Sequence, residues 1–262
     1  MLFLLSKLGF LDSIGKYVRM IFEVLVSCFR RPPAWRLIRD QLYEIGVLSL
    51  SVVALTGFST GLVLAAQSFY QLADKGLASA TGIMVSKAMI TELGPILTAM
   101  MVTGRVGAAM CAELGTMKVT EQIDALQSMA VNPLRYLIGP RYLATFIMMP
   151  LLTMFSIIMG IFGGYLLAVY FFKMAPSTYF DPMQVYVTPF DFFIGFVKSV
   201  VFGILIVTIC TYKGVTTTGG AAGVGRSTTN CVVICYTAIL FTNFLLTLGL
   251  NIIRSEIERW IL

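Results

Sequence analysis

The sequence of 262 residues contains no histidine. Without an imidazole, it lacks the usual general base for serine and cysteine nucleophiles and the commonest ligand of catalytic zinc. Charged residues are also scarce, at 12% of the chain, where a soluble domain has about a quarter. These absences exclude histidine-assisted nucleophilic catalysis and argue against an ordinary soluble protein. We predict no catalytic residue in this chain.

Long stretches of the chain carry no charge at all. Residues 45–73, 142–172 and 227–253 contain no Asp, Glu, Lys or Arg, and each run exceeds the roughly 20 residues that a helix needs to cross a bilayer. Two further apolar runs carry isolated charges: residues 83–104, with Lys87 and Glu92, and residues 192–212, with Lys198. The sequence therefore predicts an all-α polytopic membrane protein with five transmembrane helices.

The basic residues are distributed unequally between the two sides of these spans. If the N-terminus is cytoplasmic, thirteen Lys and Arg residues lie inside and four outside. The positive-inside rule then predicts a cytoplasmic N-terminus, and a basic face beside anionic lipid explains the net charge of +6 without nucleic acid as a partner.

The five cysteines form no C-x-x-C pair. They are Cys28, Cys111, Cys210, Cys231 and Cys235, and four of them fall in or beside predicted spans. With no histidine to join them, we interpret them as small apolar packing residues and predict no metal site.

Two cytoplasmic segments have the pattern of amphipathic helices. In residues 14–30, polar residues recur every three or four positions, which favours a helix lying in the membrane interface; an irregular sixth span is the alternative. Residues 120–130 form the second candidate, with Thr120 as the expected N-cap. That helix is the right size to dock in a groove of a partner subunit, or it packs beneath the bundle.

The stretch GAAGVGRSTT, residues 220–229, differs from a Walker A motif by Arg226 in place of lysine. A phosphate-binding loop needs a preceding buried strand and a nearby acid for magnesium, but this stretch joins two spans and no acid lies between Asp191 and Glu256. We expect a tight glycine turn whose Ser227, Thr228 and Thr229 cap the last helix, and no nucleotide site.

Glu92 is the one acid deep within a predicted span. It lies about 14 Å from the outer end of its helix, where a carboxylate costs on the order of 3 kcal/mol unless it faces protein or water. Lys87 is about 140° away from Glu92 around the helix, so we do not expect the two to pair. Lys87 lies nearer the outer end of the span, and we expect its side chain and that of Lys198 to reach the membrane surface. Pro95 is expected to loosen the helix beside Glu92 and free backbone carbonyls.

Two blocks of the sequence resemble the MlaE-type permease family. They are TELGPILTAMMVTGRVGAAMCAELGTMKVTEQIDALQSMAVNPLRYLIGPR, residues 91–141, and GGAAGVGRSTTNCVV, residues 219–233. Members of that family are membrane subunits of ABC transporters that move lipids together with MCE-domain proteins. The resemblance extends from about Gln41 to Asn251. We predict one permease domain over residues 1–262, with an N-terminal segment at 1–44, a five-span bundle at 45–253 and a tail at 254–262.

The resemblance also implies partners for a homodimer in the bacterial inner membrane. A separate cytoplasmic ABC ATPase would bind the ATP, so the chain would need no cofactor of its own. A periplasmic MCE-domain protein would exchange phospholipid or a related lipid with the membrane, and a small STAS-domain cytoplasmic subunit is left open as a further partner.

By the same resemblance, a substrate cavity at the dimer centre would be lined by Leu64, Gln67, Glu92 and Leu93. Many relatives have arginine immediately before the glutamate, whereas this chain has Thr91. In the cytoplasmic helix, the residues expected to couple to the ATPase are Thr120, Glu121, Gln122, Ile123, Asp124, Leu126 and Met129.

Two further questions stay open at the level of sequence. An ion-coupled carrier or channel that uses Glu92 as its protonation site is the alternative function. The motifs GFSTG (residues 57–61) and GIFGG (residues 160–164) allow close helix approach, either in a dimer or within one subunit.

Overall fold

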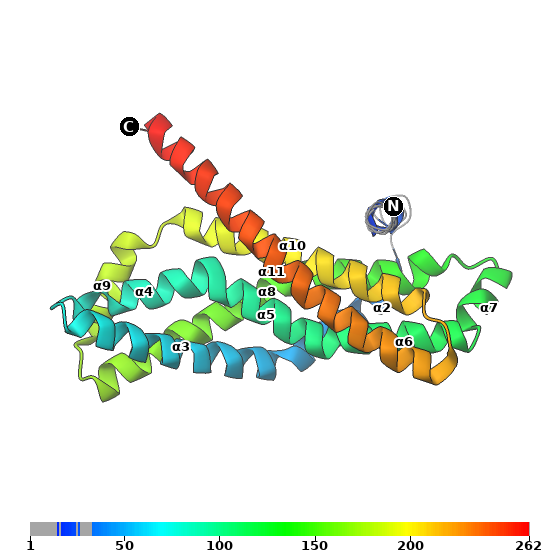
Figure 1. Cartoon of the computed structure of the whole chain (residues 1–262), viewed down its shortest axis with the longest axis horizontal. Helices are drawn as coiled ribbons and strands as arrows, with labels where there is room; N and C mark the ends of the chain where they lie inside the picture. The colour runs from blue at the N-terminus through cyan, green and yellow to red at the C-terminus, as the bar shows by residue number, and fades with distance from the viewer. Residues whose placement is uncertain (1–14, 16, 25, 27–32, 262) are drawn as a thin grey trace, which may run out of the picture. The chain divides into compact units, whose positions relative to one another are not determined.

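The computed structural model describes residues 15, 17–24, 26 and 33–261, and every regular element in these ranges is helical (Figure 1). The α-helices are α2 (Trp35–Ile45), α3 (Leu50–Ala73), α4 (Thr81–Ala88), α5 (Gly94–Val102), α6 (Ala108–Val119), α7 (Gln122–Ser128), α8 (Gly139–Leu166), α9 (Pro176–Tyr186), α10 (Pro189–Val215) and α11 (Gly220–Ile261). Short 3-10 turns, η1 (Val47–Ser49) and η2 (Ala78–Ala80), precede α3 and α4. Four π-helical turns interrupt the longer helices: η3 (Met89–Leu93), η4 (Thr103–Gly107), η5 (Leu134–Ile138) and η6 (Leu167–Phe171).

Within the described ranges, five helical stretches are long and apolar enough to cross a membrane. They are Trp35–Ala73, Ala78–Val119, Leu134–Phe171, Pro189–Val215 and Gly220–Glu256. Each one overlaps a predicted span, which confirms an all-α polytopic membrane protein. A helix satisfies its own backbone hydrogen bonds, and so it can lie in hydrocarbon where water cannot.

The chain divides into two compact units, each assembled from three segments that are distant in sequence. The first unit comprises Met1–Ile45, Thr103–Phe146 and Ile204–Tyr236, and the second comprises Gly46–Val102, Ile147–Gly203 and Thr237–Leu262. Helices α8, α10 and α11 contribute residues to both units.

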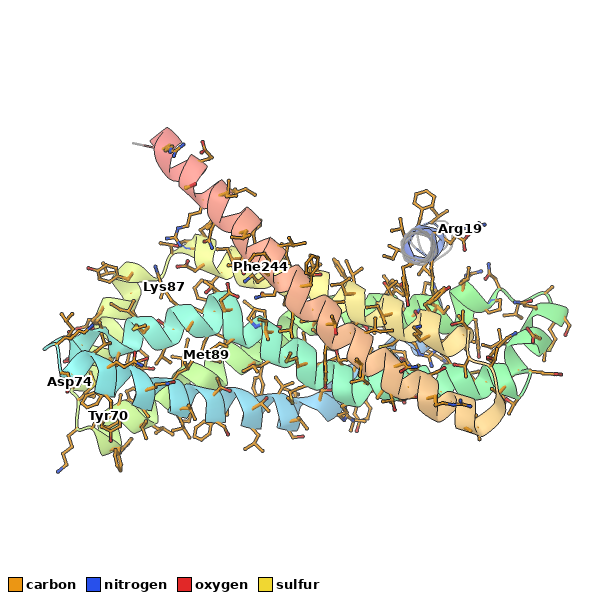
Figure 2. The ribbon with its side chains drawn as sticks, in the orientation of Figure 1. Arg19, Tyr70, Asp74, Lys87, Met89 and Phe244 are labelled. Carbon is orange, nitrogen blue, oxygen red and sulfur yellow. The ribbon has the colours of Figure 1, made fainter. Side chains whose placement is uncertain are left out.

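Large apolar side chains remain exposed along the spans. Tyr70 on α3 and Phe244 on α11, both labelled in Figure 2, are 61% and 58% exposed. Exposing large apolar surfaces to water is unfavourable and promotes association. Exposing them to lipid hydrocarbon carries no such free-energy cost, because hydrocarbon is itself apolar. The exposed faces are therefore those expected of a protein whose spans meet lipid.

Small residues bring α3 and α8 together in the second unit. A Cβ atom added to Gly61 would collide with the backbone of Gly160, and one added to Gly57 would come within 2.6 Å of the Ser156 carbonyl oxygen. The GFSTG and GIFGG motifs thus pack against each other within one chain. This contact accounts for both motifs without a dimer interface.

The described part of the N-terminal amphipathic segment is helical at residues 17–24. Arg19 Nε donates to Glu23 Oε1 over 2.8 Å on an exposed face, and the Tyr17 ring lies 4.5 Å from that of Tyr212 in the first unit. Burial, and then the neighbouring Tyr212, raises the pKa of Tyr17 to about 12. The rest of the predicted segment includes residues 14, 16, 25 and 27–30, which lie outside the described residues. Its interfacial position stays a prediction.

The expected helix over residues 120–130 is shorter than its pattern indicates. Helix α6 continues to Val119, and Thr120 is its C-cap rather than the N-cap of the next helix. Glu121 adopts a left-handed conformation with φ of 60°, and α7 follows as Gln122–Ser128. The prediction of Thr120 as an N-cap is wrong because the preceding span continues farther past its apolar part than expected.

The prediction that Ser227, Thr228 and Thr229 cap the last helix is also wrong. Gly219 and Gly220 have positive φ angles of 89° and 64° and make the turn, so α11 already begins at Gly220. The Thr228 hydroxyl then donates to the Val224 carbonyl over 2.9 Å from within the helix. Only the two glycines at the turn act as the sequence predicts, since they accept a conformation that other residues rarely adopt.

Candidate functional site

Glu92 lies on the π-helical turn η3, three residues before Pro95. Proline has no N–H, so it cannot donate to the carbonyl four residues earlier, which belongs to Thr91. That carbonyl instead accepts a hydrogen bond from Lys198 Nζ over 2.9 Å. The predicted loosening of the helix at Pro95 is therefore present, and the freed Thr91 carbonyl accepts a hydrogen bond from the Lys198 ammonium group.

Lys198 on α10 is the partner of Glu92. Its side chain is fully buried, and Nζ donates to Glu92 Oε1 over 2.6 Å and to Thr247 Oγ1 over 2.8 Å, in addition to the Thr91 carbonyl. An ammonium has three N–H donors, so all three are used. The expectation that Lys198 reaches the membrane surface is wrong, because these acceptors compensate its burial.

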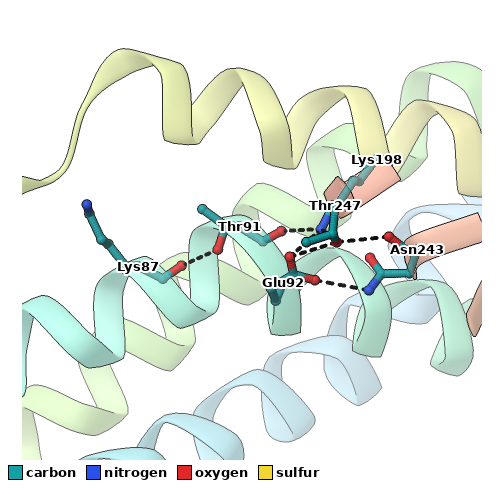
Figure 3. A network of polar contacts seen from close by, with 6 residues as sticks. All are labelled: Lys87, Thr91, Glu92, Lys198, Asn243 and Thr247. Atoms are coloured by element: carbon teal, nitrogen blue, oxygen red, sulfur yellow. Dashed lines mark hydrogen bonds and ion pairs between the residues drawn. The ribbon is translucent and has the colours of Figure 1, made fainter. Parts of the chain in front are cut away.

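Helix α11 completes the network around Glu92 (Figure 3). Asn243 Nδ2 donates to Glu92 Oε2 over 3.0 Å, and Thr247 Oγ1 lies 2.9 Å from Glu92 Oε1. Asn243 Oδ1 is buried and has no hydrogen-bond partner in the described part of the chain. It remains available as an acceptor for water or for a bound polar group.

A cavity of about 140 Å³ adjoins this network in the second unit. Its lining residues are Lys87, Thr91, Glu92, Asp191, Ile194, Thr247, Leu250, Asn251 and Arg254. At its wall, Arg254 Nη1 donates to Asp191 Oδ1 over 3.0 Å, and the other oxygen of Asp191 accepts from the Thr188 backbone at the start of α10. The cavity is mostly polar and has room for several water molecules or a small headgroup.

Lys87 lines the same cavity but does not pair with Glu92. In Figure 3 its ammonium points away from the carboxylate, while its carbonyl accepts from the Thr91 hydroxyl over 2.8 Å. Lys87 and Met89, both labelled in Figure 2, are two positions apart in one helical stretch and lie on different sides of it: Met89 is buried, and Lys87 is partly exposed.

The four residues expected to line a substrate cavity lie in different surroundings. Leu64 and Leu93 pack against the same buried cluster of Ala65, Val85 and Met89. Gln67 is exposed on α3. Of the four, Glu92 alone lines the polar cavity, while Leu64 and Leu93 pack against the apolar cluster.

Comparison with known proteins places the chain in a family. Residues 38–248 match the family described as Permease MlaE. The chain belongs to the MlaE permease family. This membership confirms the resemblance seen in the two sequence blocks.

Individual MlaE-family relatives cover most of the chain. It is 42% identical over 236 residues to a probable ABC transporter permease protein of Rickettsia bellii, with 90% of this chain and 91% of the relative covered. It is 34% identical over 241 residues to the intermembrane phospholipid transport system permease protein MlaE of Haemophilus influenzae, with 92% of each covered. It is 37% identical over 225 residues to the chloroplastic protein TRIGALACTOSYLDIACYLGLYCEROL 1 of Arabidopsis thaliana, with 86% of this chain and 64% of the relative covered.

Within this MlaE-family chain, the predicted coupling residues belong to the first unit. Ile123 is buried against its own chain at 5% exposure, Leu126 is half-buried, and Met129 is 65% exposed. Lys118 Nζ forms an ion pair with Asp124 Oδ1 over 2.9 Å, which links α7 to the end of α6. The apolar residues expected to form one docking face are therefore divided: Ile123 holds the segment to the chain, and Met129 is accessible to a partner.

The sequence interpretation missed Lys198, Asn243 and Thr247 as neighbours of Glu92. One feature of the sequence could have indicated Asn243 and Thr247. They are four positions apart in an otherwise apolar span, which places both on the same face of α11. Their pairing with an acid 151 and 155 positions away could not be read from spacing alone.

Proposed function

We propose that this chain is the permease subunit of an ABC-type transporter that moves phospholipid or a related lipid between the inner membrane and a periplasmic MCE-domain carrier. A separate cytoplasmic ATPase supplies the energy, and two copies of the chain form the transport unit. Membership of the MlaE family supports this proposal, as does the name of the Haemophilus influenzae relative. The N-terminus is cytoplasmic, and a STAS-domain subunit is a further candidate partner.

The observation that favours this function over an ion-coupled carrier is the ion pair of Glu92 and Lys198. A carrier that uses Glu92 must alternate between its charged and neutral forms. Protonation of Glu92 would leave Lys198 fully buried without a counter-charge, and an uncompensated buried charge costs about 3–5 kcal/mol. The pair therefore favours a fixed polar network over a proton-exchanging acid.

The conformation of the glycine-rich stretch supports the proposal that ATP is hydrolysed by a separate chain. In a nucleotide-binding loop, backbone N–H groups surround the phosphates. Here residues 220–229 are helical, and Arg226 Nε donates to the Ala222 carbonyl over 3.4 Å within that helix. Those N–H groups are oriented along a helix axis, which supports an ATPase on a separate chain.

The cargo-binding region in this proposal combines two surfaces of the second unit. Leu64 and Leu93 form part of an apolar surface suited to acyl chains, and the cavity beside Glu92 is lined by charged groups of both signs. Glu92 is paired with Lys198 and Arg254 with Asp191, so Lys87 is the cation at the cavity that we expect to face a polar headgroup. Thr91 contributes no charge there, in contrast to the arginine of many relatives.

Transfer of labelled phospholipid tests the proposal. The chain would be reconstituted in proteoliposomes with its ATPase, and transfer to a periplasmic MCE-domain acceptor measured with ATP or with an imposed proton gradient. The double variant Glu92→Gln/Lys198→Met removes both charges together, and we expect it to retain substantial ATP-dependent transfer. Glu92→Trp fills the cavity and should lower lipid occupancy. Transfer driven by the proton gradient without ATP, and lost in the double variant, would instead establish the carrier.

A further inference from the structure

Four of the five cysteines converge in the first unit. Cys111 comes from α6, Cys210 from α10, and Cys231 and Cys235 from α11, and all four are buried with at most 1% exposure. Cys231 and Cys235 are one helical turn apart, so both thiols face α10. The sequence interpretation treated these residues as separate packing positions, because nothing in their spacing reveals that three helices bring them together.

The thiols of Cys210, Cys231 and Cys235 form a compact triangle. Cys231 Sγ lies 3.1 Å from Cys210 Sγ, Cys235 Sγ lies 3.7 Å from Cys210 Sγ, and all three sulfur atoms are within 4.8 Å of one another. Three thiolates at about 2.3 Å from a central cation would be about 4 Å apart in a trigonal arrangement. Small side-chain rotations are enough to convert the observed triangle into that arrangement.

The surroundings restrict what this triangle can bind. The cluster offers sulfur and no imidazole or carboxylate, and soft sulfur ligands favour soft cations over magnesium or calcium. Gly107 lies against Cys210, where an added Cβ would come within 2.9 Å of its sulfur, so the site needs a residue without a side chain at that position. Cys111 contacts Cys231 but is not a member of the triangle.

We propose that Cys210, Cys231 and Cys235 form a binding site for one soft monovalent cation of the Cu(I) class. Zinc in structural sites is almost always four-coordinate, whereas the triangle in the described residues supplies three sulfur ligands. Each thiol that binds as a thiolate releases one proton to the solvent, so a complex of three thiolates with one monovalent cation releases three protons and carries a net charge of −2.

Titration with Cu(I) tests the site. The full-length chain would be purified in detergent without oxygen and titrated with Cu(I) against a competing chromophoric chelator. We expect one Cu(I) per chain. X-ray absorption of the loaded wild-type protein should show three sulfur neighbours at about 2.3 Å and no nitrogen or oxygen neighbour.

Single variants locate the ligands. Cys210→Ser, Cys231→Ser and Cys235→Ser should each weaken Cu(I) binding by more than the roughly 10- to 100-fold that loss of an outer-shell partner costs. Cys28→Ser and Cys111→Ser also remove one thiol each and should bind as the wild type does. Size-exclusion elution as a single species shows that each variant is folded.

Three results would overturn the proposal. They are an affinity of the wild type no higher than that of the triple serine variant, equal loss in Cys28→Ser or Cys111→Ser, or nitrogen and oxygen neighbours in the absorption spectrum. The spectrum depends on the wild-type protein alone, so it decides the question even if a variant does not fold.

Discussion

Lys198 Nζ lies 2.6 Å from Glu92 Oε1, although the two residues are 106 positions apart in the chain. Lys198 is fully buried while the Glu92 side chain is 34% exposed at the cavity. Breaking such a pair by removing one partner is expected to cost more than removing both, because one buried charge is then left alone.

The first prediction measures this coupling. Glu92→Gln should lower the free energy of unfolding by about 3 kcal/mol, the lower end of the range for broken buried pairs because Glu92 is partly exposed. The double variant Glu92→Gln/Lys198→Met should recover most of that loss. Chemical unfolding of all variants in detergent gives the double-mutant cycle, and strictly additive losses would show that the pair is not coupled.

The second prediction concerns the contact of Gly61 with Gly160. Gly61→Ala places a methyl group against the opposing backbone and should destabilise the chain by about 1–3 kcal/mol. Gly249→Ala on α11 is the matched control, since nothing lies within 4 Å of its added Cβ, and alanine should stabilise that helix slightly. Thermal unfolding compares the two, and an equal effect at both positions would argue against close packing of α3 on α8.

The third prediction concerns the proposed docking of an ATPase on α7 and the residues that follow it. Met129→Asp should reduce copurification of the ATPase at least about tenfold while leaving the chain folded, because Met129 is 65% exposed. Ile123→Asp buries a charge and should instead reduce the yield of folded chain. Gln127→Asp, on the exposed surface outside the predicted coupling set, is the control. Full ATPase recovery and normal transfer with Met129→Asp would remove the coupling role.

The fourth prediction concerns Arg226. Arg226→Lys restores the lysine of a Walker A motif, but the surrounding residues are helical and present no loop of N–H groups to phosphate. Neither the wild type nor the variant should bind ATP in equilibrium dialysis of the purified chain. Saturable binding that improves in the lysine variant would contradict this assignment.

The sequence alone was sufficient for the spans, the fold class and the family. Charge-free runs such as residues 45–73 predict helices across the bilayer because an unpaired charge in hydrocarbon is costly, whatever the neighbouring helices do. The loosened helix at Pro95 was equally predictable, since a missing N–H is a local covalent property. The turn at Gly219 and Gly220 belongs to the same class of local effects.

Only the tertiary structure decided which polar groups meet. Lys198 was expected at the membrane surface because a long lysine side chain can extend from within a span to the interface. In the structure, Glu92, Thr91 and Thr247 from two other stretches provide it with three acceptors. The thiol triangle has the same origin, since Cys210 meets Cys231 and Cys235 only when α10 packs on α11.

Helix ends such as Thr120 were predicted wrongly because capping preferences are weak compared with the packing that extends a helix. Local covalent rules act within a few residues, whereas burial and charge compensation depend on contacts between helices that spacing along one helix does not encode.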